Sequence, residues 1–182
     1  MSSNGTLIGV SDRTVVNNYY LMFFRGDIAG DPIQLVDEST SPNSSQWTLN
    51  STTGCTSGQW HHACVVQAST TSRTIYLDGG NSASSTVAIN PKNVNRLNIG
   101  AYDLNGAGGF FNGDIAEAAV WNAALNADEV RSLSRGMTCD KVRPQSLVFY
   151  APLVRDLIDY KGGLTITNNN TATVANHPRV YA

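Results

Sequence analysis

The sequence predicts an all-β fold, an antiparallel jelly-roll sandwich with one short helix near residues 127–134. Two observations predict it. Asn, Ser and Thr number 18, 17 and 16 among 182 residues, of which only 14% are charged, and this composition favours strands and turns over helices. Short strand-like runs also recur between turn residues, without the alternation of strands and long helices that predicts a parallel sheet.

The same composition excludes several classes of protein. The net charge is −2 and the chain holds three lysines, which argues against a nucleic-acid-binding surface. A hydrophobic content of 41% is too high for a disordered chain. The sequence has no apolar run of about 18 residues that would span a membrane. Its first residues lack the basic and apolar regions of a signal peptide, so we expect synthesis in the cytoplasm without export.

About ten short strands are predicted from alternation and turn signals. They cover residues 6–10, 18–25, 32–36, 46–49, 60–68, 73–77, 86–89, 96–99, 115–121 and 146–151. Segment 18–25 is apolar on both alternating faces, so we expect it inside the sandwich. In segment 60–68 we expect the face that carries His62, Cys64, Val66 and Ala68, together with Trp60, to point to the core. Residues 106–109 contain three glycines and are predicted as a loop. Residues 164–167 and 171–174 flank three asparagines like the arms of a hairpin.

One helix is predicted by its capping residues. Asn126 is suited to the N-cap, and Glu129 stands three residues later, as in a capping box. Leu125 and Val130 have the spacing of a hydrophobic staple, and Gly136 supplies the stop. The helix should therefore have about two turns.

No catalytic constellation is visible in the sequence. Gly-x-Ser-x-Gly, a P-loop and His-Glu-x-x-His do not occur. Sandwich glycosidases place carboxylates at i, i+2 and i+4 so that all of them face one groove. Asp114 and Glu117 are three apart and would point to opposite faces of a strand. We therefore predict that the chain is not an enzyme.

Four residues are candidates for ligand contact: Tyr102, Asp103, Asn105 and Glu117. Tyr102 has an aromatic ring that could stack on a ligand, and Glu117 is a carboxylate within an apolar strand. The more common explanations are core packing or chance surface exposure for the tyrosine, turn formation for Asp103 and Asn105, and a solvent-facing or arginine-paired carboxylate for Glu117. Asp27, Asp31 and Asp103 supply the loop oxygens that calcium prefers, but at a low ligand density. No other cofactor is expected.

The three cysteines form no Cys-x-x-Cys pair and have no zinc spacing, so we expect reduced thiols at Cys55, Cys64 and Cys139. Of the pair His61 and His62, we expect one to be buried and hydrogen-bonded and the other to be exposed.

Several segments, in their order, resemble laminin-G-like (concanavalin A-like lectin/glucanase) jelly-roll domains. These are Trp-His-His-Ala-Cys-Val at 60–65, Ile-Tyr-Leu-Asp-Gly at 75–79, Leu-Asn-Ile-Gly at 97–100, Phe-Asn-Gly-Asp-Ile-Ala-Glu at 111–117 and Trp-Asn-Ala-Ala-Leu at 121–125. The tail at 142–153 and 176–180 is similar to the ending of such domains in structural proteins of tailed bacteriophages. The resemblance implies a jelly roll over residues 1–140, and residues 141–182 are expected to form C-terminal strands or an extension packed on the same domain.

The resemblance implies a non-enzymatic structural protein of a phage virion surface, such as a capsid decoration or fibre component, with possible glycan contact. A free carbohydrate-binding module is the alternative, and a glycoside hydrolase of the same fold is a third. The expected partners are other virion proteins or copies of the chain itself, with no nucleic acid and no membrane. Relatives carry further N-terminal strands that have no counterpart before residue 6, which favours an oligomer that covers the exposed edges.

Overall fold

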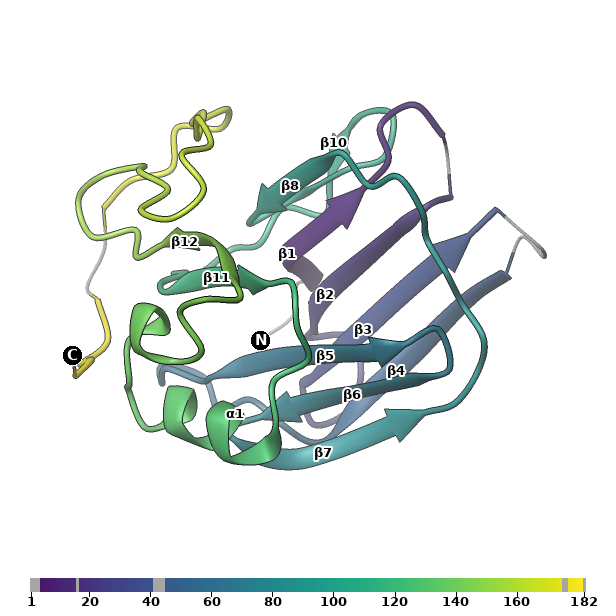
Figure 1. The fold of residues 1–182 in the computed structure, drawn as a ribbon, viewed down its shortest axis with the longest axis horizontal. Coiled ribbons are helices and arrows are strands. Elements are labelled where there is room, and N and C mark those ends of the chain that lie inside the picture. Colours follow the sequence, from purple (N-terminus) through teal and green to yellow (C-terminus); the bar gives the residue numbers. More distant parts are fainter. Residues whose placement is uncertain (1–3, 16, 41–44, 175–176, 182) are drawn as a thin grey trace. The chain divides into compact units, whose positions relative to one another are not determined.

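The computed structural model describes residues 4–15, 17–40, 45–174 and 177–181. The chain forms two compact units, Met1–Asn112 and Gly113–Ala182. Each unit is described by itself (Figure 1). The predicted domain boundary at residue 140 stays a prediction. Within the described ranges, no helix is long and apolar enough to cross a membrane.

The first unit contains a five-stranded antiparallel sheet in the order β4-β3-β2-β1-β8. Its strands are β1 (Asn4–Ser11), β2 (Tyr19–Arg25), β3 (Pro32–Ser39), β4 (Ser45–Gly54) and β8 (Arg96–Ile99). Strand β3 is buried along its whole length, because it lies inside the sheet and both of its faces are covered. Its neighbour β2 lies within the segment 18–25, in which the sequence places apolar residues on both faces.

A three-stranded antiparallel sheet in the order β5-β6-β7 completes the sandwich of this unit. Its strands are β5 (Ala63–Ser69), β6 (Ser72–Leu77) and β7 (Gly80–Ser85), which lie side by side in Figure 1. A small hairpin of β9 (Tyr102–Asp103) and β10 (Ala107–Gly108) follows β8.

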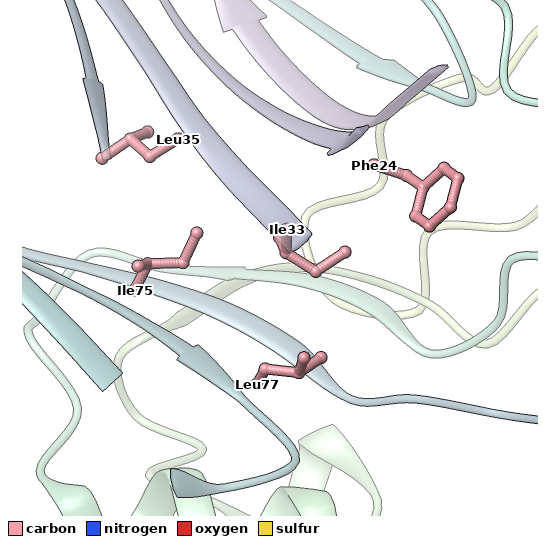
Figure 2. Close-up of a cluster of buried hydrophobic side chains, with 5 residues drawn as sticks. All are labelled: Phe24, Ile33, Leu35, Ile75 and Leu77. Carbon is pink, nitrogen blue, oxygen red and sulfur yellow. The ribbon is translucent and has the colours of Figure 1, made fainter. Parts of the chain in front are cut away.

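The core between the two sheets is a cluster of five buried apolar side chains (Figure 2). It consists of Phe24, Ile33, Leu35, Ile75 and Leu77. They come from β2 and β3 of one sheet and β6 of the other. Ala63 and Val65 of β5 also pack against this cluster. On the outer face of the five-stranded sheet, Tyr19, Leu21 and Val36 form a second cluster.

The second unit contains the two-stranded antiparallel sheet of β11 (Ala118–Trp121) and β12 (Leu147–Ala151), the helix α1 (Ala127–Ser134) and a 3-10 turn, η1 (Cys139–Lys141). The helix has the predicted ends. Asn126 accepts hydrogen bonds from the backbone N–H groups of Asp128 and Glu129, and the Glu129 carboxylate accepts one from Asn126 N. Leu125 and Val130 are buried.

The prediction of an all-β antiparallel sandwich with one short helix is confirmed, because every strand pair among the described residues is antiparallel. Some elements were predicted wrongly. Residues 86–89 are not a strand: Ile89 is buried, but its N–H donates to Thr70 O outside any ladder. The third strand of the small sheet is instead β7, a segment poor in apolar residues.

Three further predictions need correction. Residues 106–109 are not wholly a loop, because Ala107 and Gly108 pair with β9. Strand β11 begins at Ala118, not at residue 115. Residues 164–174 form no two-armed hairpin: the Asn168 side chain bonds both the N–H and the C=O of Ala172, while Thr165 makes a single bridge with Ile158. A side chain that bonds nearby backbone groups competes with strand pairing.

Candidate functional site

A row of hydrogen-bonded polar side chains crosses the outer face of the five-stranded sheet. Side chains alternate between the faces of a strand. In β3, Ile33 and Leu35 face the core cluster, so Gln34 and Glu38 lie on the outer face. We call the hydrogen-bonded set on this face the polar ladder. Its members are Tyr19 and Arg25 of β2, Gln34 and Glu38 of β3, and Gln46 and Asn50 of β4.

One rung of the ladder is centred on Tyr19. Its hydroxyl donates to Glu38 Oε2 at 2.5 Å and accepts from Gln46 Nε2 at 2.7 Å. Burial, together with the Glu38 carboxylate, raises the pKa of Tyr19 far above its ordinary value. The phenol therefore stays neutral and holds Glu38 and Gln46 in fixed positions.

A second rung runs across the same three strands. Arg25 Nη1 donates to Gln34 Oε1, and Gln34 Nε2 donates to Asn50 Oδ1 at 2.7 Å. The same guanidinium holds Asp27 through two hydrogen bonds of 2.8 Å. The bonds from Arg25 hold the pKa of the Asp27 carboxyl well below its usual range. The rung thus ends in a neutralised ion pair.

The ladder can both donate and accept hydrogen bonds. Gln46, Thr48 and Asn50 are exposed on β4, and each amide keeps a group beyond its bond within the ladder. Several fixed polar groups on one sheet face, next to aromatic rings, suit a ligand rich in hydroxyl groups.

Three of the four predicted ligand contacts lie in one hairpin beside the ladder. The ring of Tyr102 packs against the Tyr19 cluster, and its centroid lies 6.2 Å from that of Phe23. The Asp103 carboxylate pairs with Arg13 at 3.5 Å and Arg96 at 3.8 Å. Asn105 has a φ of 82°, in the turn between β9 and β10. Tyr102 therefore packs against other side chains and Asp103 forms ion pairs, as the alternatives to ligand contact predict. The ligand role of these residues stays a prediction.

Glu117 belongs to the second unit. Its Oε2 accepts a hydrogen bond of 2.7 Å from the Tyr150 hydroxyl, and its Oε1 lies 3.2 Å from His177 Nε2. Burial, with the bond to Glu117, raises the pKa of Tyr150 far above its ordinary value. These contacts join three segments of the second unit, and a ligand role for Glu117 also stays a prediction.

The candidate calcium ligands have other contacts. Asp27 pairs with Arg25, and Asp103 pairs with Arg13 and Arg96. The Asp31 backbone forms hydrogen bonds with Ile28 and Cys55. No group of three His, Cys, Asp or Glu side chains suited to a metal occurs in the part of the chain that the structure describes. Calcium binding therefore gains no support here.

The residues around the Trp-His-His segment at 60–62 form a hydrogen-bond network. His61 Nδ1 lies 2.8 Å from Asp78 Oδ2, and its Nε2 accepts from Thr56 N at 2.8 Å. Asp78 Oδ1 accepts from His62 N at 2.9 Å. Burial lowers the pKa of His62 to about 4 and raises the pKa of the Cys64 thiol to about 12, so both are neutral at pH 7. Trp60 is 42% exposed and lies outside β5, so its predicted place in the core was wrong.

None of the six ladder residues is among the four ligand contacts predicted from the sequence. A signal was present. Gln34 and Glu38, and likewise Gln46 and Asn50, are four residues apart in strands, so each pair shares a face.

A comparison with protein-family models matches residues 2–131 to the family described as the concanavalin A-like lectin/glucanases superfamily. No curated protein matches the chain. One similar solved structure is an S-layer domain-containing protein (residues 221–444) from Clostridium thermocellum, with 20% identity and a TM-score of 0.38. The match covers 74% of this chain and 64% of that one, which is less than two thirds of its length.

Proposed function

This chain belongs to the concanavalin A-like lectin/glucanases superfamily, and on that premise we propose that it is a non-enzymatic structural protein of a phage virion surface that contacts a glycan through the polar ladder. The observation that carries the glycan contact is the pair of hydrogen-bonded rungs on the outer sheet face. Buried Tyr19 and Gln34 hold the exposed amides of Gln46 and Asn50 in place, and preorganised amides bind hydroxyl groups with a smaller loss of side-chain entropy.

The state of the carboxylates supports binding without hydrolysis. Glycosidases use a carboxylic acid and a carboxylate roughly 5–9.5 Å apart, one of them protonated at working pH. In the ladder, Glu38 accepts a hydrogen bond from Tyr19, and Asp27 is held ionised by Arg25. Asp37, the neighbour of Glu38, lies on the other face and inside the sandwich. This arrangement favours a binding surface over an acid–base pair.

The virion role rests on the sequence resemblance of the tail to phage structural proteins and on a surface with few charges. Uncharged, hydrogen-bonding loops suit a domain packed among neighbours in a particle. The second candidate is a free carbohydrate-binding module, which the ladder would serve equally well.

Glycan binding is tested with the full chain on immobilised polysaccharides and by calorimetry with the best oligosaccharide. The double variant Gln46→Ala/Asn50→Ala should weaken binding at least about tenfold, because it removes a side chain from each rung. Thr52→Ala, on the same strand but outside the ladder, is the matched control. Binding that survives the double variant would rule out the ladder as the site. Release of reducing ends during incubation would overturn the non-enzymatic assignment.

The location is tested separately by mass spectrometry and antibody labelling of purified phage particles. The proposal expects the chain on the particle in a fixed copy number. If the chain were found only in the particle-free fraction, the free carbohydrate-binding module would take its place.

A further inference from the structure

The space between the two sheets of the first unit is polar at one end. In β3, Asp37 follows the core residue Leu35 on the same face of the strand. In β6, Arg73 precedes the core residue Ile75 on the same face. Gln67 of β5 stands directly opposite Arg73, and residues that stand opposite each other on neighbouring strands share a face. Asp37, Gln67 and Arg73 therefore point between the sheets, and we call these three side chains the inner polar site.

The inner polar site contains buried polar atoms that have no hydrogen-bond partner among the described residues. They are both carboxylate oxygens of Asp37, Arg73 Nη1 and Gln67 Oε1. Asp37 and Arg73 form an ion pair through Oδ2 and Nε, which leaves Oδ1 and Nη1 unused. Because buried polar atoms in folded proteins are nearly always hydrogen-bonded, these atoms point to a partner from outside the described residues.

The amide of Gln67 cannot turn to supply that partner. Its Nε2 donates to the carbonyl oxygen of Ser69 at 2.6 Å. A flipped amide would place Oε1 against this carbonyl oxygen, and two acceptors without a hydrogen between them repel each other. Gln67 Oε1 therefore stays an acceptor, like the two oxygens of Asp37, and Arg73 Nη1 is a donor.

From these donors and acceptors we propose that the inner polar site binds one ordered water molecule, which donates to Asp37 and to Gln67 Oε1 and accepts from Arg73 Nη1. Water has two hydrogens and two lone pairs, and a buried water typically makes about three hydrogen bonds. The three partners come from β3, β5 and β6. The water thus joins the two sheets of the sandwich.

Other ligands do not match this set of atoms. An anion without a hydrogen cannot donate to Asp37 or Gln67, and a metal cation cannot accept from Arg73. A larger neutral molecule is excluded because the side chains of Asp37 and Arg73 are each 1% exposed. Water donates twice, accepts, and is small enough for a buried polar site.

The inner polar site lies behind one rung of the polar ladder. Asp37 and Glu38 are neighbours in β3, and their side chains point to opposite faces of the sheet. A fixed Asp37 therefore also fixes the part of β3 from which Glu38 accepts the hydrogen bond of the Tyr19 hydroxyl. The inference does not rest on the glycan function, but it gives this rung a rigid support.

The test uses the full chain at a pH above the pKa of Asp37, which burial raises to about 6, so that the carboxylate is ionised. Nuclear Overhauser effects between water and the N–H groups of the Arg73 side chain should reveal a long-lived water. In a crystal structure, this water should lie about 2.5–3.2 Å from Asp37, Gln67 Oε1 and Arg73 Nη1. Magnetic relaxation dispersion of the water oxygen counts the long-lived waters in solution.

Two variants and a control assign this water to the site. Gln67→Met keeps the length of the side chain but removes one acceptor, so the residence time of the water should fall at least about tenfold. Asp37→Leu/Arg73→Met removes the charged partners and should contain one long-lived water fewer than the wild type. Thr74→Ala is the control, because Thr74 lies on the other face of β6, where it bonds Ser84, and it should keep the water.

Several results would overturn the proposal. One is a wild-type crystal structure in which Gln67 contacts Asp37 or Arg73 directly, with no water between them. Others are equal numbers of long-lived waters in the wild type and the double variant, or an unchanged residence time in Gln67→Met. Loss of the water in Thr74→Ala would also contradict it, because general loosening would then control the water. Circular dichroism melting shows which variants are folded, and the measurements on the wild type decide the question without them.

Discussion

Arg73 Nε lies 3.1 Å from Asp37 Oδ2, and both side chains are 1% exposed. Asp37 comes from β3 and Arg73 from β6, so one ion pair links the two sheets inside the first unit. Arg73 Nη2 also reaches Ser85 Oγ at 3.5 Å. Asp37 Oδ1 and Arg73 Nη1 are buried and have no hydrogen-bond partner among the described residues. The pair is thus a costly feature in a protein with few charges, and each partner depends on the other.

Removal of one partner should destabilise the first unit strongly. Arg73→Met leaves the Asp37 carboxylate buried without its counter-charge, and we expect a loss of about 3–5 kcal/mol in the free energy of unfolding. The double variant Asp37→Leu/Arg73→Met removes both charges and should recover most of that loss. Urea unfolding at pH 7 measures both. A double variant as unstable as the single one would show that packing, not charge, dominates at this position.

The same pair predicts a dependence of stability on pH. Burial raises the pKa of Asp37 to about 6, although Arg73 acts in the opposite direction. The carboxyl has a pKa of about 3.9 in an unfolded chain, so between these values the folded state keeps a proton that the unfolded state has released. This contribution to stability is present below about pH 4 and is lost as the pH rises toward 6.

The measurement compares urea unfolding of the wild type and Asp37→Asn from pH 4 to pH 7. The wild type should lose stability relative to the variant over this range, because asparagine does not titrate. Parallel curves for the two proteins would contradict the raised pKa.

Elements fixed by local contacts were predictable from the sequence, and α1 is the best case. Its cap, Asn126, and its N3 residue, Glu129, bond each other across one turn, so a few neighbouring residues determine where it begins. Strands depend on distant partners. The apolar segment 86–89 has the composition of a strand but forms no strand ladder with the described residues, whereas β7 is polar and forms because β6 lies beside it.

The orientation of β5 shows a second limit. Ala63 and Val65 face the core cluster, whereas Val66, on the predicted core face, is also buried. Alternation cannot choose between two buried faces, since both carry apolar residues. The polar ladder could not be predicted from the sequence for a related reason. Its hydrogen bonds join residues of three strands, and the register of those strands exists only in the folded sheet.

The contact between His61 and Asp78 predicts that substitution of Asp78 lowers stability. Asp78→Ala removes the acceptors for both His61 Nδ1 and His62 N, and we expect a cost of about 1–2 kcal/mol. Asp78→Asn keeps an acceptor for His62 N and tolerates the φ of 55° at this position, so its cost should be smaller. Thermal melts of the two variants give the comparison, and an equal loss would argue that charge alone matters.

The capping box of α1 predicts a contrast between two substitutions. Asn126→Ala removes the acceptor for Asp128 N and Glu129 N and should cost about 1 kcal/mol. Glu129→Gln keeps a side chain that can bond Asn126 N, but it loses the ion pair with Arg143 at 2.8 Å. Hydrogen exchange of residues 127–134 should therefore quicken in the alanine variant. Unchanged exchange there would show that packing of Val130 and Leu133 suffices to hold the helix.

Glu117 combines a backbone φ of 55° with two side-chain contacts in the second unit. Both Glu117→Ala and Glu117→Gly lose the contacts with Tyr150 and His177. Only glycine adopts this φ without strain, so the glycine variant should be the more stable of the two by about 1 kcal/mol. Both should speed exchange of the Tyr181 N–H, which donates to Gly136 O at 2.6 Å, because the His177 contact anchors the segment that carries it. An alanine variant as stable as the glycine variant would mean that the backbone relaxes out of the left-handed region once the carboxylate is removed.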